Sequence, residues 1–231
     1  MAEFSYNEVT PELVEEFKKI VPGKVFVGDE INDDYAHDEM PIYGKGAPSV
    51  LIEATTTEDI SAIMKLCYEN SIPVIPRGAG TGLTGAAVAL HGGVMIDMSK
   101  MNKILEYDKE NFVVHVQAGV LLNQLAEDAQ KQGLLYPPDP GEKFATLGGN
   151  VSTNAGGMRA VKYGCTRDYV RAMTVVLPTG EIVKLGATVS KTSTGYSLLN
   201  LMIGSEGTLG IITELTLKLI PAPKETISLI I

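Results

Sequence analysis

The sequence predicts an α+β fold, in which strands and helices are partly segregated along the chain. Two observations predict it. Strand-like runs outnumber helical stripes, and the two kinds of element do not alternate regularly from one end to the other. The length of 231 residues fits one large domain or two small ones with a substantial core.

The first element is predicted to be a helix over residues 11–21. Thr10 can cap it, Pro11 suits the first helical position, and the apolar residues that follow share one face. A polar, acidic stretch over 28–39 and a loop over 43–49 come next. We expect residues 1–45 to form an N-terminal helix and a lead-in segment.

A compact β-α-β unit is predicted after this lead-in segment. Residues 50–54 read as a strand, Thr55 and Glu58 have the spacing of a capping box, and 72–75 read as a second strand. The helix between them carries an apolar stripe made of Ile60, Ile63, Met64 and Cys67.

The remaining elements follow from alternation and turn residues. Residues 94–98 and 112–118 read as strands, and an apolar stripe from Leu121 to Ala129 predicts a helix that Gly133 terminates. Residues 173–177 and 181–185 form a predicted hairpin around 178–180. The stretch 211–219 alternates as an antiparallel strand with one solvated face.

Composition and charge exclude several classes of function. The net charge of −9 argues against a basic surface of the kind that binds nucleic acids or anionic membranes. No apolar run is long enough to span a membrane. The N-terminus does not resemble a signal peptide, so we expect a cytoplasmic protein. Cys67 and Cys165, like the three histidines, lack the spacing of a metal site, so we expect no metal here.

The first of three glycine clusters is PRGAGTGLTG at 76–85. It contains Gly80-x-Gly82-x-x-Gly85, the spacing of a Rossmann dinucleotide fingerprint. However, residues 86–93 leave no room for the crossover helix that a Rossmann unit needs. Such glycines can instead let successive backbone N–H groups converge on an anion, with Arg77 as a charged donor. A flexible surface loop is the alternative interpretation.

The other clusters are PPDPGEKFATLGGNVSTNAGG at 137–157 and GSEGTLGII at 204–212. The second cluster suggests an extended, flat ligand that lies along the chain without interference from large side chains. Three such loops, far apart in sequence, indicate one long ligand that is touched at several points. A dinucleotide fits this description better than a small metabolite does.

These segments, together with KYG at 162–164, TRDYV at 166–170 and PTGEIV at 178–183, carry a resemblance to a known family. They resemble the FAD-binding (PCMH-type) domain of the vanillyl-alcohol oxidase group. Within that group, the sequence is most similar to the glycolate oxidase flavin subunit and to FAD-linked D-lactate dehydrogenases, with D-2-hydroxyglutarate dehydrogenase close by. The resemblance covers roughly residues 35–223 in the family's order.

The resemblance implies two α+β subdomains, over 46–100 and 101–222, with FAD between them. Residues 77–83 would hold the pyrophosphate: Arg77, Gly78, Ala79, Gly80, Thr81, Gly82 and Leu83. The flavin and ribityl side would be lined by Asp139, Thr146, Gly149, Ser152 and Asn154, with Gly157 allowing close approach. The dinucleotide site would be completed by Glu206, Gly210, Ile211 and Ile212.

Two departures from the family pattern affect these expectations. Covalent members have a histidine where this chain has Thr81, so the resemblance implies non-covalent FAD. The usual Gly-Tyr-Asp-Leu segment reads Gly-Tyr-Ser-Leu at 195–198, which removes a carboxylate at Ser197.

The family also has a C-terminal substrate domain, which residues 223–231 would only begin. That domain supplies the metal site and the substrate-side residues, so no catalytic residue is assigned in this chain, and we expect no turnover by this chain alone. The resemblance implies part of a 2-hydroxy-acid dehydrogenase for D-lactate or glycolate. Its redox partner would be an iron–sulfur subunit, an electron-transfer flavoprotein or a quinone. Alternatives are a related enzyme for another alcohol or sugar, a non-catalytic flavin-carrying assembly subunit, and an NAD-linked Rossmann enzyme.

Overall fold

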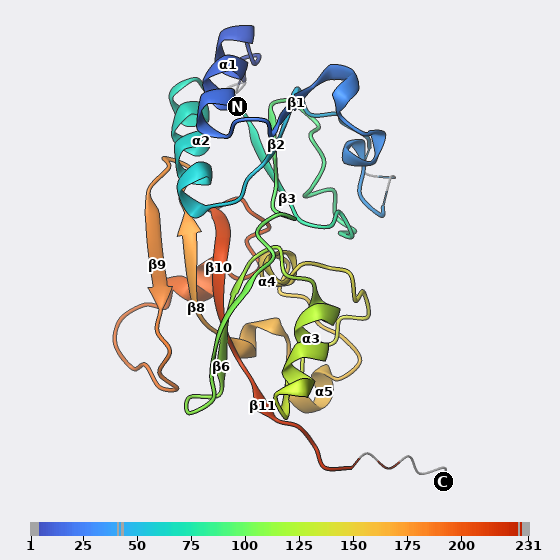
Figure 1. Ribbon diagram of the computed structural model, residues 1–231, viewed down its shortest axis with the longest axis vertical. Helices are drawn as coiled ribbons and strands as arrows, with labels where there is room; N and C mark the ends of the chain where they lie inside the picture. The colour runs from blue at the N-terminus through green and yellow to red at the C-terminus, as the bar shows by residue number, and fades with distance from the viewer. Residues whose placement is uncertain (1–4, 41, 43, 226, 228–231) are drawn as a thin grey trace.

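The computed structural model describes residues 5–40, 42, 44–225 and 227. Two sheets organise these residues, one of four strands near the N-terminus and one of five strands that continues to the C-terminal region (Figure 1). Helices and strands are mixed without regular alternation, and this confirms the predicted α+β class.

The first sheet has the strand order β1-β2-β4-β3. Its strands are β1 (Val25–Val27), β2 (Val50–Glu53), β3 (Val74–Arg77) and β4 (Val94–Asp97). β2 and β3 both run parallel to β4, whereas β1 pairs antiparallel with β2. No helix lies between β3 and β4. This excludes the Rossmann interpretation, as the short spacing predicted.

Two helices accompany this sheet at the N-terminal end of the molecule (Figure 1). Helix α1 (Pro11–Ile20) begins after Thr10, whose side chain accepts a hydrogen bond from the backbone N–H of Leu13, as predicted. Helix α2 (Thr57–Glu69) buries the predicted stripe, including Cys67. Burial raises the pKa of the Cys67 thiol to about 12, so Cys67 behaves as a small core residue.

The second sheet is antiparallel throughout, with the order β5-β6-β10-β8-β9. Its strands are β5 (Ile104–Asp108), β6 (Val113–Gln117), β8 (Val170–Val176), β9 (Ile182–Gly186) and β10 (Ile211–Lys218). The predicted hairpin is confirmed as β8 and β9. Helix α3 (Leu122–Lys131) and the short pair β7 (Leu134–Leu135) and β11 (Ile220–Pro221) complete this half.

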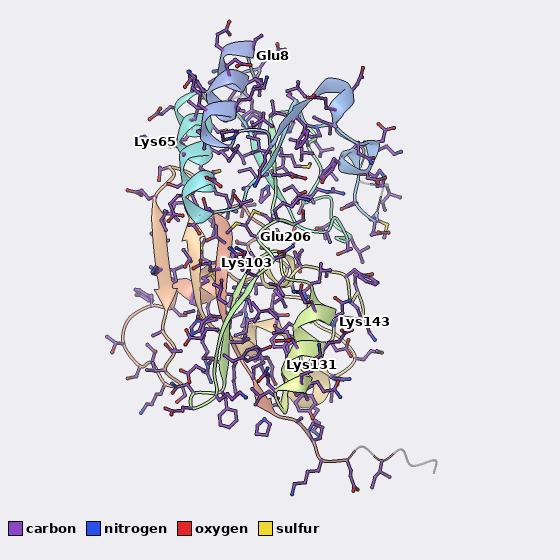
Figure 2. The ribbon with its side chains drawn as sticks, in the orientation of Figure 1. Glu8, Lys65, Lys103, Lys131, Lys143 and Glu206 are labelled. Atoms are coloured by element: carbon purple, nitrogen blue, oxygen red, sulfur yellow. The ribbon has the colours of Figure 1, made fainter. Side chains whose placement is uncertain are left out.

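One apolar core runs through both sheets, from Phe17 in α1 to Leu217 in β10. Helix α2 lies next to β8, and its Thr57 hydroxyl donates to the Thr213 hydroxyl in β10 over 2.9 Å. The hairpin turn at Gly180 packs on the helix backbone near Lys65, which Figure 2 labels. The two halves are therefore held together by shared packing.

Several sequence-based details were wrong. The predicted solvated face of the last strand is less exposed than expected, because Thr216 on it is buried and Glu214 and Lys218 are half-buried. The strand predicted at 72–75 lies at 74–77. β1, within the expected lead-in segment, belongs to the first sheet, because it pairs with β2. Of the segment 223–231, residues 226 and 228–231 lie outside the described residues.

The capping box of α2 is also one residue later than predicted, and this gives a direct test. Thr56 and Asp59 form the box, and Asp59 also accepts a hydrogen bond from the backbone N–H of Thr55. We expect Asp59→Ala to lower the free energy of unfolding by about 1 kcal/mol. Glu58 is exposed and is the residue that the sequence predicted for the box. The control Glu58→Ala should change the free energy of unfolding by less than about 0.5 kcal/mol. Urea denaturation of both variants measures the difference, and equal losses would contradict the observed box.

Among the described residues, no helix is long and apolar enough to cross a membrane. Nor does any cluster of three or more His, Cys, Asp or Glu side chains in that part of the chain have a geometry that could hold a metal ion.

Candidate functional site

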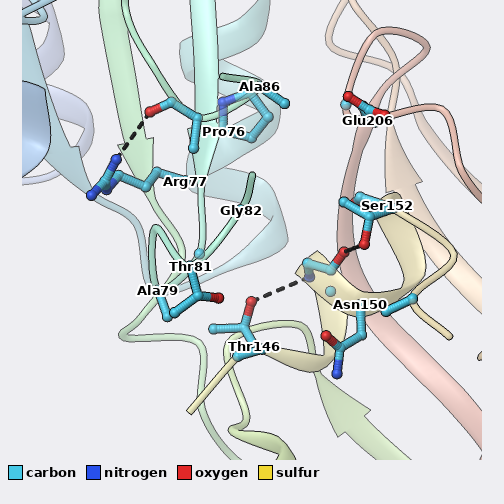
Figure 3. Close-up of a pocket in the computed structure, with 18 of the residues that line it drawn as sticks. Pro76, Arg77, Ala79, Thr81, Gly82, Ala86, Thr146, Asn150, Ser152 and Glu206 are labelled. Atoms are coloured by element: carbon cyan, nitrogen blue, oxygen red, sulfur yellow. Dashed lines mark hydrogen bonds between the residues drawn. The ribbon is translucent and has the colours of Figure 1, made fainter. Parts of the chain in front are cut away.

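The three glycine-rich clusters meet at one pocket of about 460 Å³. It lies between the loop after β3, the short helix α4 (Leu147–Ser152) and the loop that precedes β10 (Figure 3). Elements from both halves of the chain therefore form its walls. Almost every residue that the resemblance implied lies here: Arg77, Gly78, Ala79, Gly80, Thr81, Gly82, Leu83, Thr146, Gly149, Ser152, Asn154, Glu206, Gly210, Ile211 and Ile212.

The first wall is the glycine loop, which we define as residues 78–84. Its backbone N–H groups donate no hydrogen bond to any other described residue. Unpaired N–H groups that line one cavity form a ready site for an anion. Gly78 has no room for a side chain, because a Cβ there would overlap the Thr146 hydroxyl of the opposite wall. Gly80 has a φ of +73°, a conformation that favours glycine.

The Arg77 side chain does not supply the free charged donor that the sequence predicted. It is only 7% exposed, and its guanidinium donates to the carbonyls of Asp34, His37 and Ala87 over 2.8–3.0 Å. In Figure 3 it extends away from Thr81 and Thr146. Burial lowers the pKa of this guanidinium, although an arginine in a protein keeps its charge. The side chain therefore links the segment 34–37 to Ala87, beside the glycine loop.

The polar stretch before β2 contacts both Gly85, which follows the glycine loop, and the Arg77 side chain. The sequence did not reveal this role. Asp38 is 3% exposed and accepts the backbone N–H of Gly85 over 2.7 Å, at the end of the glycine loop. The Tyr35 ring lies under the Arg77 guanidinium, and its hydroxyl donates to Asp97 over 2.8 Å. Burial, with the bond to Asp97, raises the pKa of the Tyr35 phenol, so it stays protonated.

The second wall is the short helix α4. Thr146 caps α4 by accepting the N–H of Gly149 over 3.2 Å. Gly148 packs against Ala118, to which its N–H donates over 2.8 Å. The pocket-lining residues Thr146, Gly149, Asn150 and Thr153 have the spacing of one helix face.

Asn150 is a polar residue of this wall that the site prediction omitted. It is 4% exposed, and its amide nitrogen has no hydrogen-bond partner among the described residues. A buried unpaired amide is costly and rare in a folded protein. The pocket wall thus offers a polar group that the described chain leaves unsatisfied.

The third wall is the loop that precedes β10, and hydrogen bonds link it to the glycine loop and to α4. The Thr84 hydroxyl donates to the Glu206 carboxylate over 3.2 Å, and the Glu206 N–H donates to the Ser152 carbonyl over 2.9 Å. Glu206 therefore lies at the middle of the molecule, between the two halves (Figure 2). Gly210, Ile211 and Ile212 add a compact, mostly apolar surface where β10 begins.

Two of the expected residues lie outside the pocket lining. Asp139 forms an ion pair of 3.5 Å with Arg159. A Cβ at Gly157 would overlap the Asp139 carbonyl, so this glycine allows close approach of the backbone rather than of a ligand. Residues of the pocket that the site prediction omitted are Pro76, Thr84, Ala86, Ala87, Met98, Ala118, Pro140, Glu142, Ala145, Gly148, Asn150, Thr153, Ala155, Gly156 and Gly207. Most of them lie in or beside the glycine clusters, so the clusters were the signal that could have found them.

The Gly-Tyr-Ser-Leu departure has a simple structural outcome. Ser197 caps the short helix α6 (Leu198–Met202) by accepting the N–H of Asn200 over 3.2 Å. Serine and aspartate are both strong residues for this position. The substitution therefore preserves the local hydrogen bond.

The donor set of the pocket fits FAD. Free backbone N–H groups suit the pyrophosphate, the small and apolar residues leave space for planar rings, and Thr, Asn and Glu side chains can bond hydroxyl and ring-edge groups. The glycines are required for this shape, because a side chain at Gly78 or Gly80 would overlap existing atoms.

Comparisons with known proteins agree with this chemistry. A family model described as an FAD binding domain matches residues 48–186. The chain is 78% identical to a D-lactate dehydrogenase of Anaerostipes hadrus, and the alignment covers all of this chain and 49% of that protein. It is 44% identical to the glycolate oxidase subunit GlcD of Bacillus subtilis, over 82% of this chain and 40% of that protein. The chain thus spans about half the length of the curated relatives it matches.

The fold is also similar to solved structures. The structure of p-cresol methylhydroxylase with bound substrate aligns with a TM-score of 0.79 and 26% identity. The alignment covers 92% of this chain and 43% of that protein. The similarity includes both sheets, since it extends over nearly the entire chain.

Proposed function

This chain belongs to the FAD binding domain family, and on that premise we propose that its central pocket holds FAD. The observation that carries the proposal is the glycine loop, whose residues line the cavity and whose backbone N–H groups have no hydrogen-bond partner among the described residues. A pyrophosphate carries charge and acceptor oxygens that such a loop binds well. The remaining walls then lie against the rest of the dinucleotide.

FAD is bound without a covalent bond in this proposal. The glycine loop has Thr81 where the covalent relatives have a histidine, and a threonine hydroxyl does not form that bond. Affinity therefore rests on the backbone of residues 78–83, on the face of α4, and on Glu206 with Gly210, Ile211 and Ile212. Asp139, which pairs with Arg159, and Gly157, which packs on the Asp139 carbonyl, lie outside the pocket lining.

We further propose that the chain is the flavin-binding part of a 2-hydroxy-acid dehydrogenase for D-lactate or glycolate. The supporting observation is the similarity to relatives named D-lactate dehydrogenase and glycolate oxidase subunit. FAD supplies the hydride acceptor, and this chain's residues bind and orient it and shield it from water. A protein such as an iron–sulfur subunit or electron-transfer flavoprotein, or a quinone, then takes the electrons in the cytoplasm.

The test uses the protein in its natural full length. We expect a yellow protein that releases one FAD per chain after acid treatment, and whose flavin absorbance is bleached anaerobically by D-lactate or glycolate. Bleaching only by an aromatic alcohol or a sugar would replace the hydroxy-acid assignment. A protein that binds no FAD would contradict the proposal, and bound FAD that no substrate reduces would favour an assembly subunit.

A further inference from the structure

One side-chain hydrogen bond joins the glycine loop to the loop that precedes β10. The Thr84 hydroxyl donates to Oε2 of Glu206 over 3.2 Å, although the two residues are 122 positions apart in the sequence. Both residues line the pocket and both are exposed, so their bond lies where the pocket opens to solvent. Among the described residues, no other hydrogen bond links residues 78–84 to residues 204–209.

The backbone is held in place at both ends of this bond. Next to Thr84, the N–H of Gly85 donates to the buried carboxylate of Asp38 over 2.7 Å. Glu206 is tied to α4, because its N–H donates to the Ser152 carbonyl over 2.9 Å. Glu206 also has a φ of +53°, which is uncommon for a residue other than glycine and which the surrounding loop must maintain. The two side chains therefore meet because each is delivered by an anchored backbone.

The same two walls also touch at the other end of the glycine loop, but in a different way. Gly207 approaches Pro76 in β3 so closely that a Cβ on the glycine would lie 2.8 Å from the proline Cγ. This packing contact can open only if a strand or a loop backbone moves. The bond between Thr84 and Glu206 needs only a rotation of two exposed side chains. The pocket can therefore widen at this point without any change in the fold.

We propose that the Thr84–Glu206 hydrogen bond is a clasp that opens when FAD enters or leaves the pocket. This inference rests on the proposed FAD site. Because the bond joins two walls at the opening, a ligand as long as a dinucleotide displaces one of the two side chains as it passes. The same bond is broken in both directions, so the clasp slows entry and exit alike. It acts on the rates of FAD exchange rather than on the affinity for FAD.

The experiment measures the association and dissociation rate constants of FAD with the full-length protein by stopped-flow flavin fluorescence. Thr84→Val keeps the shape of the side chain but removes the hydrogen-bond donor. We expect this variant to raise both rate constants by the same factor, about three- to tenfold, as the loss of one exposed hydrogen bond allows. Thr84→Ser keeps the hydroxyl, so both rate constants should stay within about twofold of the wild type.

Thr81→Val is the matched control within the same loop. In Figure 3 the Thr81 hydroxyl has no hydrogen bond to the other residues drawn, so its loss should not raise the association rate constant. Glu206→Met removes the acceptor at the other end of the clasp. Its association rate constant should rise as much as that of Thr84→Val, and the double variant should show no further rise, because the same bond is lost in each.

A rise in the dissociation rate constant alone in Thr84→Val would overturn the inference, because it would make the hydroxyl a direct contact of the ligand. Unchanged rate constants in this variant, or additive increases in the double variant, would overturn it as well. In these cases the wild type still binds FAD, and the proposed function stands. A wild-type protein that binds no FAD would contradict the proposed function itself.

Discussion

Gly82→Val is expected to weaken FAD binding by about 100-fold or more while leaving the fold stable. Gly82 lines the pocket, and a Cβ added there would meet no atom of the chain within 4 Å. The valine side chain therefore fits the cofactor-free protein but takes space that the bound ligand needs. Its φ also lies outside the left-handed region, so the backbone accepts a larger residue.

The measurement is a titration with FAD, accompanied by a thermal unfolding curve without FAD. Gly82→Ala should give a smaller loss than Gly82→Val, because it adds less volume. Ala187→Val also introduces a valine, at an exposed site that does not line the pocket. It should change neither the FAD affinity nor the unfolding temperature. Unchanged FAD affinity in Gly82→Val would mean that the ligand does not lie against the glycine loop.

Gly148→Val is expected to lower the free energy of unfolding by about 3 kcal/mol, the upper part of the usual range for overpacking. A Cβ at Gly148 would lie 2.7 Å from the Ala118 Cβ and 3.0 Å from the Ala118 carbonyl oxygen. Helix α4 would have to move away from this contact, and the wall of the pocket would move with it. The unfolding midpoint should fall by about 6–12 °C for a chain of this size.

The pairing with Ala118 provides the control for this prediction. Ala118→Gly removes the nearer of the two contacts, so the double variant should recover part of the stability and of the FAD affinity. Thr153→Ala, at the exposed C-terminal cap of α4, should by itself change the free energy of unfolding only slightly. Strictly additive losses in the double variant would contradict the packing of α4 on Ala118.

Local sequence signals predicted much of the fold. Thr10 and Pro11 marked the start of α1, and alternation around Pro178-Thr179-Gly180 located the β8–β9 hairpin. The short spacing after Gly85 excluded a crossover helix. These features depend on residues close in sequence, and that is why they could be found without knowledge of the tertiary structure.

The features that were missed depend on contacts between distant segments. Helix α4 contains Gly148 and Gly149, which disfavour helices, and it forms because Thr146 caps it and Ala118 accepts its backbone. The hydrogen bonds of Tyr35 and Asp38 join a polar segment to Asp97 in β4 and to Gly85, both more than 40 residues later. No local periodicity marks such a pairing, although the three glycine clusters correctly indicated a common site.

The most direct test of the central claim is a crystal structure of the full-length protein with FAD bound. We predict that the pyrophosphate oxygens lie within hydrogen-bond distance of the backbone N–H groups of residues 78–83. The flavin and its ribityl chain should lie along α4 and the start of β10. A dinucleotide bound elsewhere, or a pyrophosphate that does not contact the glycine loop, would contradict this account.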